Sequence, residues 1–290
     1  MSDPAVLARI HSLELQARAV VEGYLAGMHR SARHGFAVEF AQHREYVPGD
    51  DFKHIDWKVF GRTERYFLKQ YELETNLVAW LFADVSDSMA YGSGAVTKYD
   101  LACTAALALG HLLVRQGDSV GLAAFDDRVR RFLRPSSQAS QLKELARQLG
   151  AGPAGEKTRL GAVLHELAER VPPRGLVLLF SDLFDEPAEL LAGLRHLRYA
   201  QHEVVVFHVL DAAELDFPFQ RVTLFRGLEQ LPDLLTDPRG VRQGYLDELH
   251  GFLREIRRGC RDLRIDYVPL RTGEDLGLAL AAYLSRRADR

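Results

Sequence analysis

Cysteine is scarce in this sequence: only Cys103 and Cys260 occur among its 290 residues. Neither belongs to a Cys-x-x-Cys pair or to a Cys/His cluster, which argues against a disulfide framework and against a structural zinc site. We expect both thiols to be small apolar groups of a protein that works in a reducing compartment.

Long apolar runs and a surplus of positive charge are missing as well. The most apolar segments, such as 176–180 and 204–209, are far shorter than the roughly 20 residues that span a bilayer. The amino terminus mixes charges and lacks the apolar core of a signal peptide. A net charge of −3 argues against a protein that binds nucleic acid by neutralising phosphates. We therefore expect a cytoplasmic protein without a membrane segment.

From residue 76 to the end, the sequence alternates between strand-like and helix-like segments. Continuous apolar runs at 77–83 and 175–181 are typical of strands buried on both faces of a parallel sheet. The alternation predicts an α/β fold, with a Rossmann-like, doubly wound and mostly parallel sheet. Further strands are expected at 119–125, 129–133 (an antiparallel edge), 203–210 and 262–268, a hairpin at 222–225 and 230–235, and helices at 98–115, 137–149, 159–171, 187–198, 239–258 and 275–287.

Residues 1–75 differ from the rest, and we predict that they form an N-terminal extension that packs on a domain of residues 76–290. A helix is expected at 4–23, where apolar residues recur three to four positions apart. The remainder is rich in charge, glycine and histidine, and only 36–40 and 65–71 alternate as strands do.

Candidate metal ligands follow the first buried strand. Asp84, Ser86 and Ser88 are spaced two apart in a tight loop, where one carboxylate and two hydroxyls supply hard oxygen ligands for Mg²⁺. Taken alone, either serine could instead cap the following helix. Thr158, just before a helix, and Asp182, at the end of the second apolar strand, add two oxygens where the loops of a parallel sheet converge. The five residues predict one site for a single divalent ion, Mg²⁺ or else Mn²⁺ or Ca²⁺.

In this order and at these places, the five residues resemble the metal-ion-dependent adhesion site (MIDAS) of von Willebrand factor A domains. In that family the serines and the threonine bind the metal directly or through water. The aspartates bind it or hold its waters, and an acidic side chain of a partner completes the shell. The resemblance implies a von Willebrand factor A-like fold and a site formed by Asp84, Ser86, Ser88, Thr158 and Asp182.

The extension carries a second resemblance. The stretches REYVPGDD (44–51), HIDWK (54–58) and KQYE (69–72) are similar to the signature of the family called domain of unknown function 58 (DUF58), and the likeness covers roughly residues 28–185. Members place such a stretch immediately before an adhesion-type domain. They are typically encoded beside MoxR-type AAA+ ATPases and are thought to act with them. The resemblance thus implies such an ATPase or its client as the partner, bound through an acidic residue.

Other interpretations fit the residues less well. The segment 150–158 nearly matches a P-loop, but Glu156 adds an acidic residue before the lysine, and no buried strand precedes the segment. A second metal site in the extension is a weaker interpretation than a loop that caps its own turns and pairs with nearby Lys and Arg. The residues of such a site would be Asp50, Asp51, His54 and Asp56.

Two functions remain, and they make different demands on the loop after the first strand. We expect a non-enzymatic, metal-dependent protein-binding module, an adaptor or co-chaperone of a MoxR-type ATPase. The alternative is a Mg²⁺-dependent, haloacid-dehalogenase-like phosphohydrolase with Asp84 as nucleophile. Such an enzyme needs a second aspartate two residues after the first, as general acid, and Ser86 occupies that place.

Overall fold

The computed structural model divides the chain into two compact units, residues 1–25 with 77–290 and residues 26–76. The residues that it describes are 4–30, 43–45, 67–69, 77–153, 159–228 and 232–288. In the smaller unit, the described residues are 26–30, which end the first helix, and an antiparallel pair of short strands, β1 (His43–Glu45) and β2 (Phe67–Lys69). β2 lies within the predicted strand 65–71. The predicted strand 36–40 and the residues Asp50, Asp51, His54 and Asp56 lie outside the described residues.

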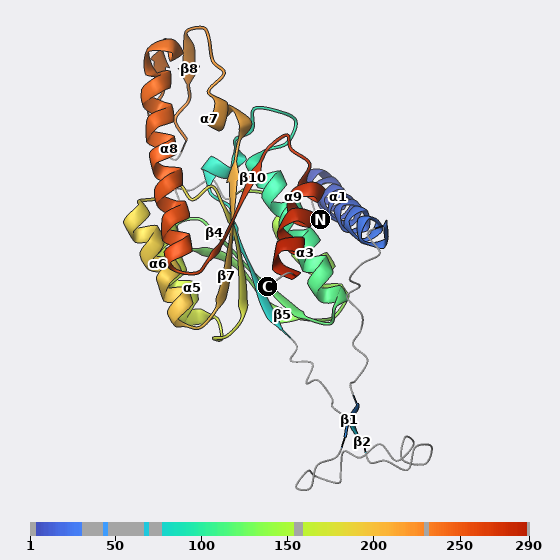
Figure 1. Ribbon diagram of the computed structural model, residues 1–290. Helices are drawn as coiled ribbons and strands as arrows, with labels where there is room; N and C mark the ends of the chain where they lie inside the picture. Colours follow the sequence, from blue (N-terminus) through green and yellow to red (C-terminus); the bar gives the residue numbers. More distant parts are fainter. Residues whose placement is uncertain are drawn as a thin grey trace. The chain divides into compact units, whose positions relative to one another are not determined.

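In the part of the larger unit that the structure describes, six strands form the sheet, in the order β10-β7-β6-β3-β4-β5 (Figure 1). All neighbours are parallel except β4 and β5, which pair antiparallel as predicted for this edge. The chain winds outward from β3 in both directions, so the predicted doubly wound, mostly parallel α/β fold is confirmed. The strands are β3 (Val78–Asp84), β4 (Ser119–Phe125), β5 (Val129–Ser136), β6 (Leu176–Ser181), β7 (Glu203–Leu210) and β10 (Asp266–Arg271).

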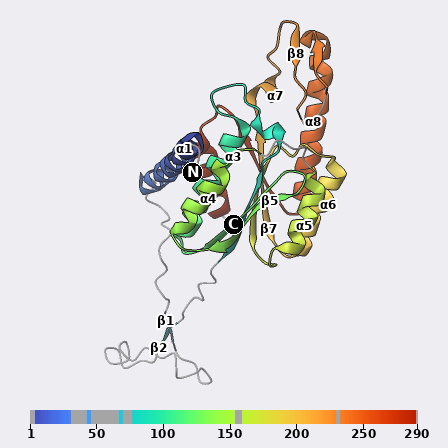
Figure 2. The same ribbon diagram turned by 180° about the vertical axis from the view of Figure 1, so that it is seen from behind.

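Helices cover both faces of the sheet, and each face has its own apolar core (Figures 1 and 2). Trp80 and Phe82 belong to one core and Leu81 and Ala83 to the other, because side chains alternate along a strand. On the side of Leu81 lie α1 (Pro4–Arg30), α3 (Lys98–Arg115), α4 (Ser140–Gly150) and α9 (Leu276–Ala288). On the side of Trp80 lie α5 (Leu160–Arg170), α6 (Pro187–Tyr199) and α8 (Pro238–Asp262).

Short elements occupy the loops at the carboxyl ends of the parallel strands. The turn η2 (Asp87–Ala90) follows β3, and α7 (Ala212–Asp216) follows β7. The antiparallel hairpin of β8 (Thr223–Phe225) and β9 (Leu234–Thr236) then leads into α8. β8 lies within the predicted strand 222–225, and β9 lies close to the end of the predicted strand 230–235. No helix among the described residues is long and apolar enough to cross a membrane.

The first helix packs on the larger unit, which differs from the predicted division at residue 76. Leu13, Ala17 and Val21 of α1 are buried in the same core as α3. Two polar contacts reinforce this packing: Arg9 pairs with Asp100 at 2.6 Å, and the Thr104 hydroxyl donates to the Gln16 side-chain oxygen at 3.2 Å. The predicted helix is present, and its apolar stripe assigns residues 1–25 to the sheet unit.

The last strand begins later than the predicted range 262–268. α8 continues to Asp262, and the N–H of Ile265 donates to the Cys260 carbonyl at 2.8 Å, which closes the helix end. Arg264 adopts a left-handed conformation with φ of 55° to make this turn, a conformation that usually selects Gly or Asn. β10 therefore spans Asp266–Arg271, and the first four predicted strand residues belong to the helix end and its turn.

Candidate functional site

Each of four adjacent parallel strands leads into an aspartate at the carboxyl edge of the sheet. Two of these aspartates bind other side chains or cap a helix. Asp126, after β4, binds the Arg130 guanidinium at 2.6 Å. Asp211, after β7, caps α7 and accepts from the Thr272 hydroxyl at 2.6 Å. The other two, Asp84 and Asp182, are those that the sequence nominates as metal ligands.

The loop after β3 folds back on Asp84, which is fully buried. The Ser86 N–H donates to one oxygen of this carboxylate at 3.0 Å, and the Ser181 hydroxyl donates to the other at 2.6 Å. The Ser86 and Ser88 hydroxyl oxygens lie 3.1 Å apart. Ser86 precedes η2 but makes no side-chain capping bond. The capping interpretation therefore does not account for Ser86.

Asp182 completes this cluster from the neighbouring strand. It is 5% exposed, and the interaction with the Ser88 side chain helps to lower the pKa of its carboxylate. Its backbone is held by buried His208, whose Nε2 lies 2.8 Å from the Asp182 carbonyl oxygen while its Nδ1 lies 2.7 Å from the Tyr267 hydroxyl. The structure thus brings together four of the five predicted ligands, Asp84, Ser86, Ser88 and Asp182. Thr158 lies outside the described residues.

Two buried carboxylates so close together repel each other. Burial, and then the charge of Asp182, raise the pKa of Asp84 to about 7. A cation placed between the carboxylates would relieve both effects. The hydroxyl and carboxylate oxygens that surround this position are the donors that Mg²⁺ and Ca²⁺ prefer, so the residues fit a hard divalent ion. Among the described residues, no group of three or more His, Cys, Asp and Glu could hold a metal ion, so a site here would depend on the serine hydroxyls as well as the two aspartates.

Lys98, at the start of α3, is part of this cluster and was missed by the sequence interpretation. Its side chain is only 3% exposed, and its Nζ lies 2.8 Å from Asp182 Oδ2 and 2.7 Å from Glu214 Oε1 of α7. Burial acts against the charged amine, but the two carboxylates raise the pKa of Lys98 above its usual range. Although burial favours protonation of Asp182, the Lys98 ammonium holds its pKa below the ordinary value.

Comparison with known proteins places this chain in a family. The profile of a family described as "Protein of unknown function DUF58" matches residues 42–248. The chain belongs to the DUF58 family. It is 27% identical over 293 aligned residues to the uncharacterized proteins Rv1480 of Mycobacterium tuberculosis and Mb1516 of Mycobacterium bovis, covering 99% of this chain and 91% of each relative.

Solved structures resemble this DUF58 chain in fold. BatB from Bacteroides thetaiotaomicron, a conserved hypothetical protein, superposes with a TM-score of 0.51 at 15% identity, over 74% of this chain and 100% of BatB. The SpRpn10 VWA domain gives a TM-score of 0.41 at 11% identity, over 71% of this chain and 94% of that domain. The strand order and the antiparallel edge described above agree with the von Willebrand factor A-like fold that the sequence predicts.

Proposed function

We propose that this DUF58 protein is a non-enzymatic protein-binding module whose affinity depends on one divalent ion. Asp84, Ser86, Ser88 and Asp182 would hold the ion, together with Thr158. The observation that carries the proposal is the buried pair Asp84 and Asp182 beside two hydroxyls, with the pKa of Asp84 raised to about 7. An ion bound there would supply a positive charge that accepts a carboxylate oxygen of a partner.

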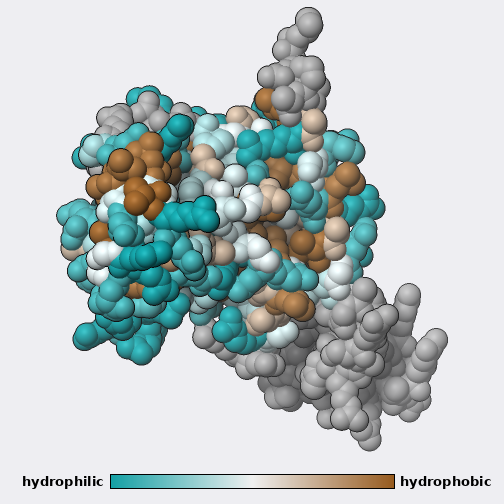
Figure 3. All heavy atoms as spheres, turned by 90° about the horizontal axis from the view of Figure 1, so that it is seen from above, coloured by the Kyte–Doolittle hydropathy of each residue, from teal (hydrophilic) through white to brown (hydrophobic). Residues whose placement is uncertain are grey.

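An exposed apolar surface at the same edge supports a protein as the ligand. The hairpin of β8 and β9 exposes four apolar side chains, Val222, Leu224, Leu234 and Leu235, between 51% and 69%. Figure 3 looks down on this edge and shows the apolar patch on the left, over the hairpin. Exposed apolar patches on a water-soluble surface commonly mark protein contacts. The contact of Lys98 with Glu214 connects α7, which precedes this hairpin, to the proposed site.

The proposed partner is an AAA+ ATPase of the MoxR type or its client, which would contribute the acidic residue. This part of the proposal rests on the family resemblance. A partner bound at both places would present an acidic side chain to the metal and apolar side chains to the hairpin. Protein interfaces commonly combine the two, because apolar contacts supply buried area and a charged contact fixes the orientation of the partner.

Capture of a purified MoxR-type ATPase on the immobilised 290-residue chain tests the proposal. We expect capture in Mg²⁺ that is lost in EDTA and in Ser86→Ala, and that persists in Ser285→Ala, which alters an exposed serine of α9. Equal capture with and without Mg²⁺ would refute metal dependence. Phosphatase turnover of a small phosphate ester, abolished by Asp84→Asn, would instead support the phosphohydrolase.

A further inference from the structure

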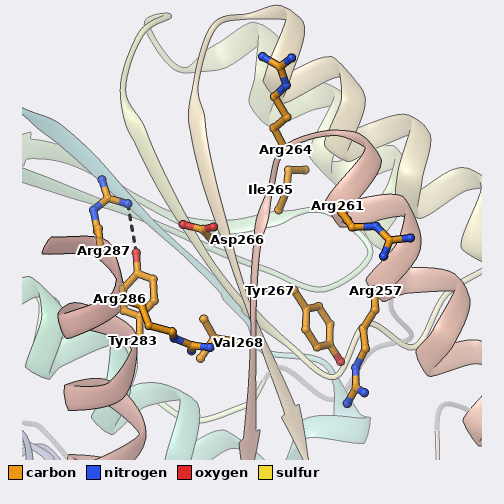
Figure 4. Close-up of a pocket in the computed structure, with 10 residues that line it drawn as sticks. All are labelled: Arg257, Arg261, Arg264, Ile265, Asp266, Tyr267, Val268, Tyr283, Arg286 and Arg287. Atoms are coloured by element: carbon orange, nitrogen blue, oxygen red, sulfur yellow. Dashed lines mark hydrogen bonds between the residues drawn. The ribbon is translucent and has the colours of Figure 1, made fainter. Parts of the chain in front are cut away.

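A basic cleft lies against β10, the strand at the end of the sheet that is farthest from β5. It has a volume of about 470 Å³ and runs between α8 and α9, as Figure 4 shows. Its lining contains five arginines and one acidic residue: Arg257, Arg261, Arg264, Arg286, Arg287 and Asp266. The protein as a whole has a net charge of −3, so this concentration of positive charge is local.

Most of this charge lacks an acidic partner. Arg287 pairs with Glu203 at 2.7 Å. Arg257, Arg264 and Arg286 are exposed and form no ion pair with any residue that the structure describes. Arg261 comes only to 4.0 Å from an acid, its neighbour in sequence. Guanidinium groups gathered in one cleft repel each other, and a ligand with several carboxylates would remove that repulsion.

The floor of the cleft offers backbone groups as well as charge. Among the described residues, β10 pairs only with β7, and the Thr272 N–H donates to the Leu210 carbonyl at 2.9 Å. Backbone groups of a strand point alternately to its two sides, so the N–H and C=O of Tyr267 and the C=O of Pro269 face away from β7. Pro269 has no N–H, which limits pairing with an incoming strand to a short stretch.

From these observations we infer that the cleft binds an extended acidic segment of a partner protein. The segment lies along β10, pairs briefly with Tyr267, and places carboxylates against the arginines of α8 and α9. Because Pro269 limits backbone pairing, charge supplies most of the affinity, and binding weakens steeply as salt rises. None of these residues belongs to the proposed metal site, so this inference stands or falls independently of the proposed function.

Fluorescence anisotropy of a labelled peptide of about ten residues that alternates Glu and Val tests the inference on the full chain. We expect binding at low ionic strength, loss of at least about tenfold in affinity in the double variant Arg257→Glu/Arg261→Glu, and no binding of the Lys-Val counterpart. Arg258→Glu is the matched control, because Arg258 is exposed on the same helix but does not line the cleft. It should bind within about twofold of the unchanged protein.

Two controls separate this ligand from other anions. A short DNA duplex and vesicles containing phosphatidylserine are titrated under the same conditions. Tighter binding of either one, lost in the double variant, would overturn the assignment to an acidic peptide. Equal peptide affinity in the double variant and the unchanged protein would overturn the site itself. Circular dichroism of each variant establishes that the fold is retained, since both arginines are exposed.

Discussion

At the residue scale, burial and the neighbouring Asp182 carboxylate disfavour the ionised form of the Asp84 side chain. Its pKa is raised to about 7, so ionisation at higher pH costs stability in the absence of metal. We predict that Asp84→Asn increases the free energy of unfolding in EDTA at pH 8 by about 2 kcal/mol. The same variant should show no rise in melting temperature on addition of Mg²⁺. Urea unfolding with and without Mg²⁺ measures both effects, and a destabilised variant in EDTA would contradict this account of Asp84.

Lys98 is the cation of the described cluster, and it would compete with a bound metal for Asp182. Replacing it with Met leaves buried carboxylates without a positive partner, which costs about 3–5 kcal/mol in EDTA. Because Mg²⁺ can then compensate those carboxylates, the Mg²⁺-induced rise in melting temperature should be larger in Lys98→Met than in the unchanged protein. Lys143→Met, at an exposed lysine of α4, is the control and should alter neither quantity. An unchanged Mg²⁺ response in Lys98→Met would show that Lys98 has no influence on the site.

The clustering of Asp84, Ser86, Ser88 and Asp182, the four candidate ligands that the structure describes, was predictable from sequence because each follows an apolar strand. A strand that is buried on both faces is visible as an unbroken apolar run, and the topology of parallel sheets then fixes where its carboxyl end lies. Lys98 lacked such a signal. Its partners Asp182 and Glu214 are 84 and 116 residues away in sequence, and only the folded chain brings them together.

At the scale of elements, two glycines let α5 and α6 approach closely. A Cβ on Gly161 would lie 2.7 Å from the backbone carbonyl of Glu189, and one on Gly193 would lie 2.8 Å from the Leu164 Cβ. Gly161→Ala should therefore cost about 1–3 kcal/mol of stability. It should also weaken the Mg²⁺ response, because the segment before α5 carries Thr158.

Gly244 of α8 provides the control for this substitution. No atom lies within 4 Å of the Cβ that an alanine would add there. Gly244→Ala should stabilise the protein by about 0.5–1 kcal/mol, because alanine loses less backbone entropy than glycine in a helix. Thermal unfolding of both variants distinguishes close packing from a general effect of removing glycine. Similar melting temperatures for the two would contradict the packing argument.

The hairpin of β8 and β9 is the element that we expect to contact a partner through apolar side chains. Leu224→Ser/Leu235→Ser should weaken capture of the ATPase by about tenfold, because exposed apolar anchors commonly dominate interfaces. The Mg²⁺-induced shift in melting temperature should persist, since neither leucine is among the proposed ligands. Leu278→Ser changes a leucine of α9 that is 72% exposed, and it should leave capture intact. Equal losses in both variants would point to a nonspecific apolar effect.

Element boundaries were harder to predict than element types. The end of α8 illustrates the reason. Arg264 occupies the left-handed position that ends the helix, where a glycine would have marked the end. The placement of α1 on the sheet depended on packing: its apolar stripe predicted a helix, but a stripe alone does not say which surface covers it.

At the scale of the whole molecule, the pH dependence of stability combines the contributions of two buried groups. These contributions change with pH in opposite directions. Burial lowers the pKa of His208 to about 4, so its contribution is present above pH 6.5 and is lost as the pH falls through 4. Asp84, with its pKa raised from 3.8 to about 7, contributes stability at low pH that is lost as the pH rises through 7. Each shift corresponds to about 3–4 kcal/mol, so in EDTA the two contributions largely cancel between pH 4 and 6.5.

A metal should remove this cancellation. A divalent ion bound beside Asp84 would stabilise its ionised form and lower its pKa, which would leave the contribution of His208 unopposed. We therefore predict that in saturating Mg²⁺ the free energy of unfolding rises by about 3 kcal/mol from pH 4.5 to 7, whereas in EDTA it changes little. Asp84→Asn should show the rising profile in EDTA, because the opposing carboxylate is gone. Parallel profiles of the unchanged protein in Mg²⁺ and EDTA would mean that no ion binds against Asp84, which would also refute the proposed metal-dependent function.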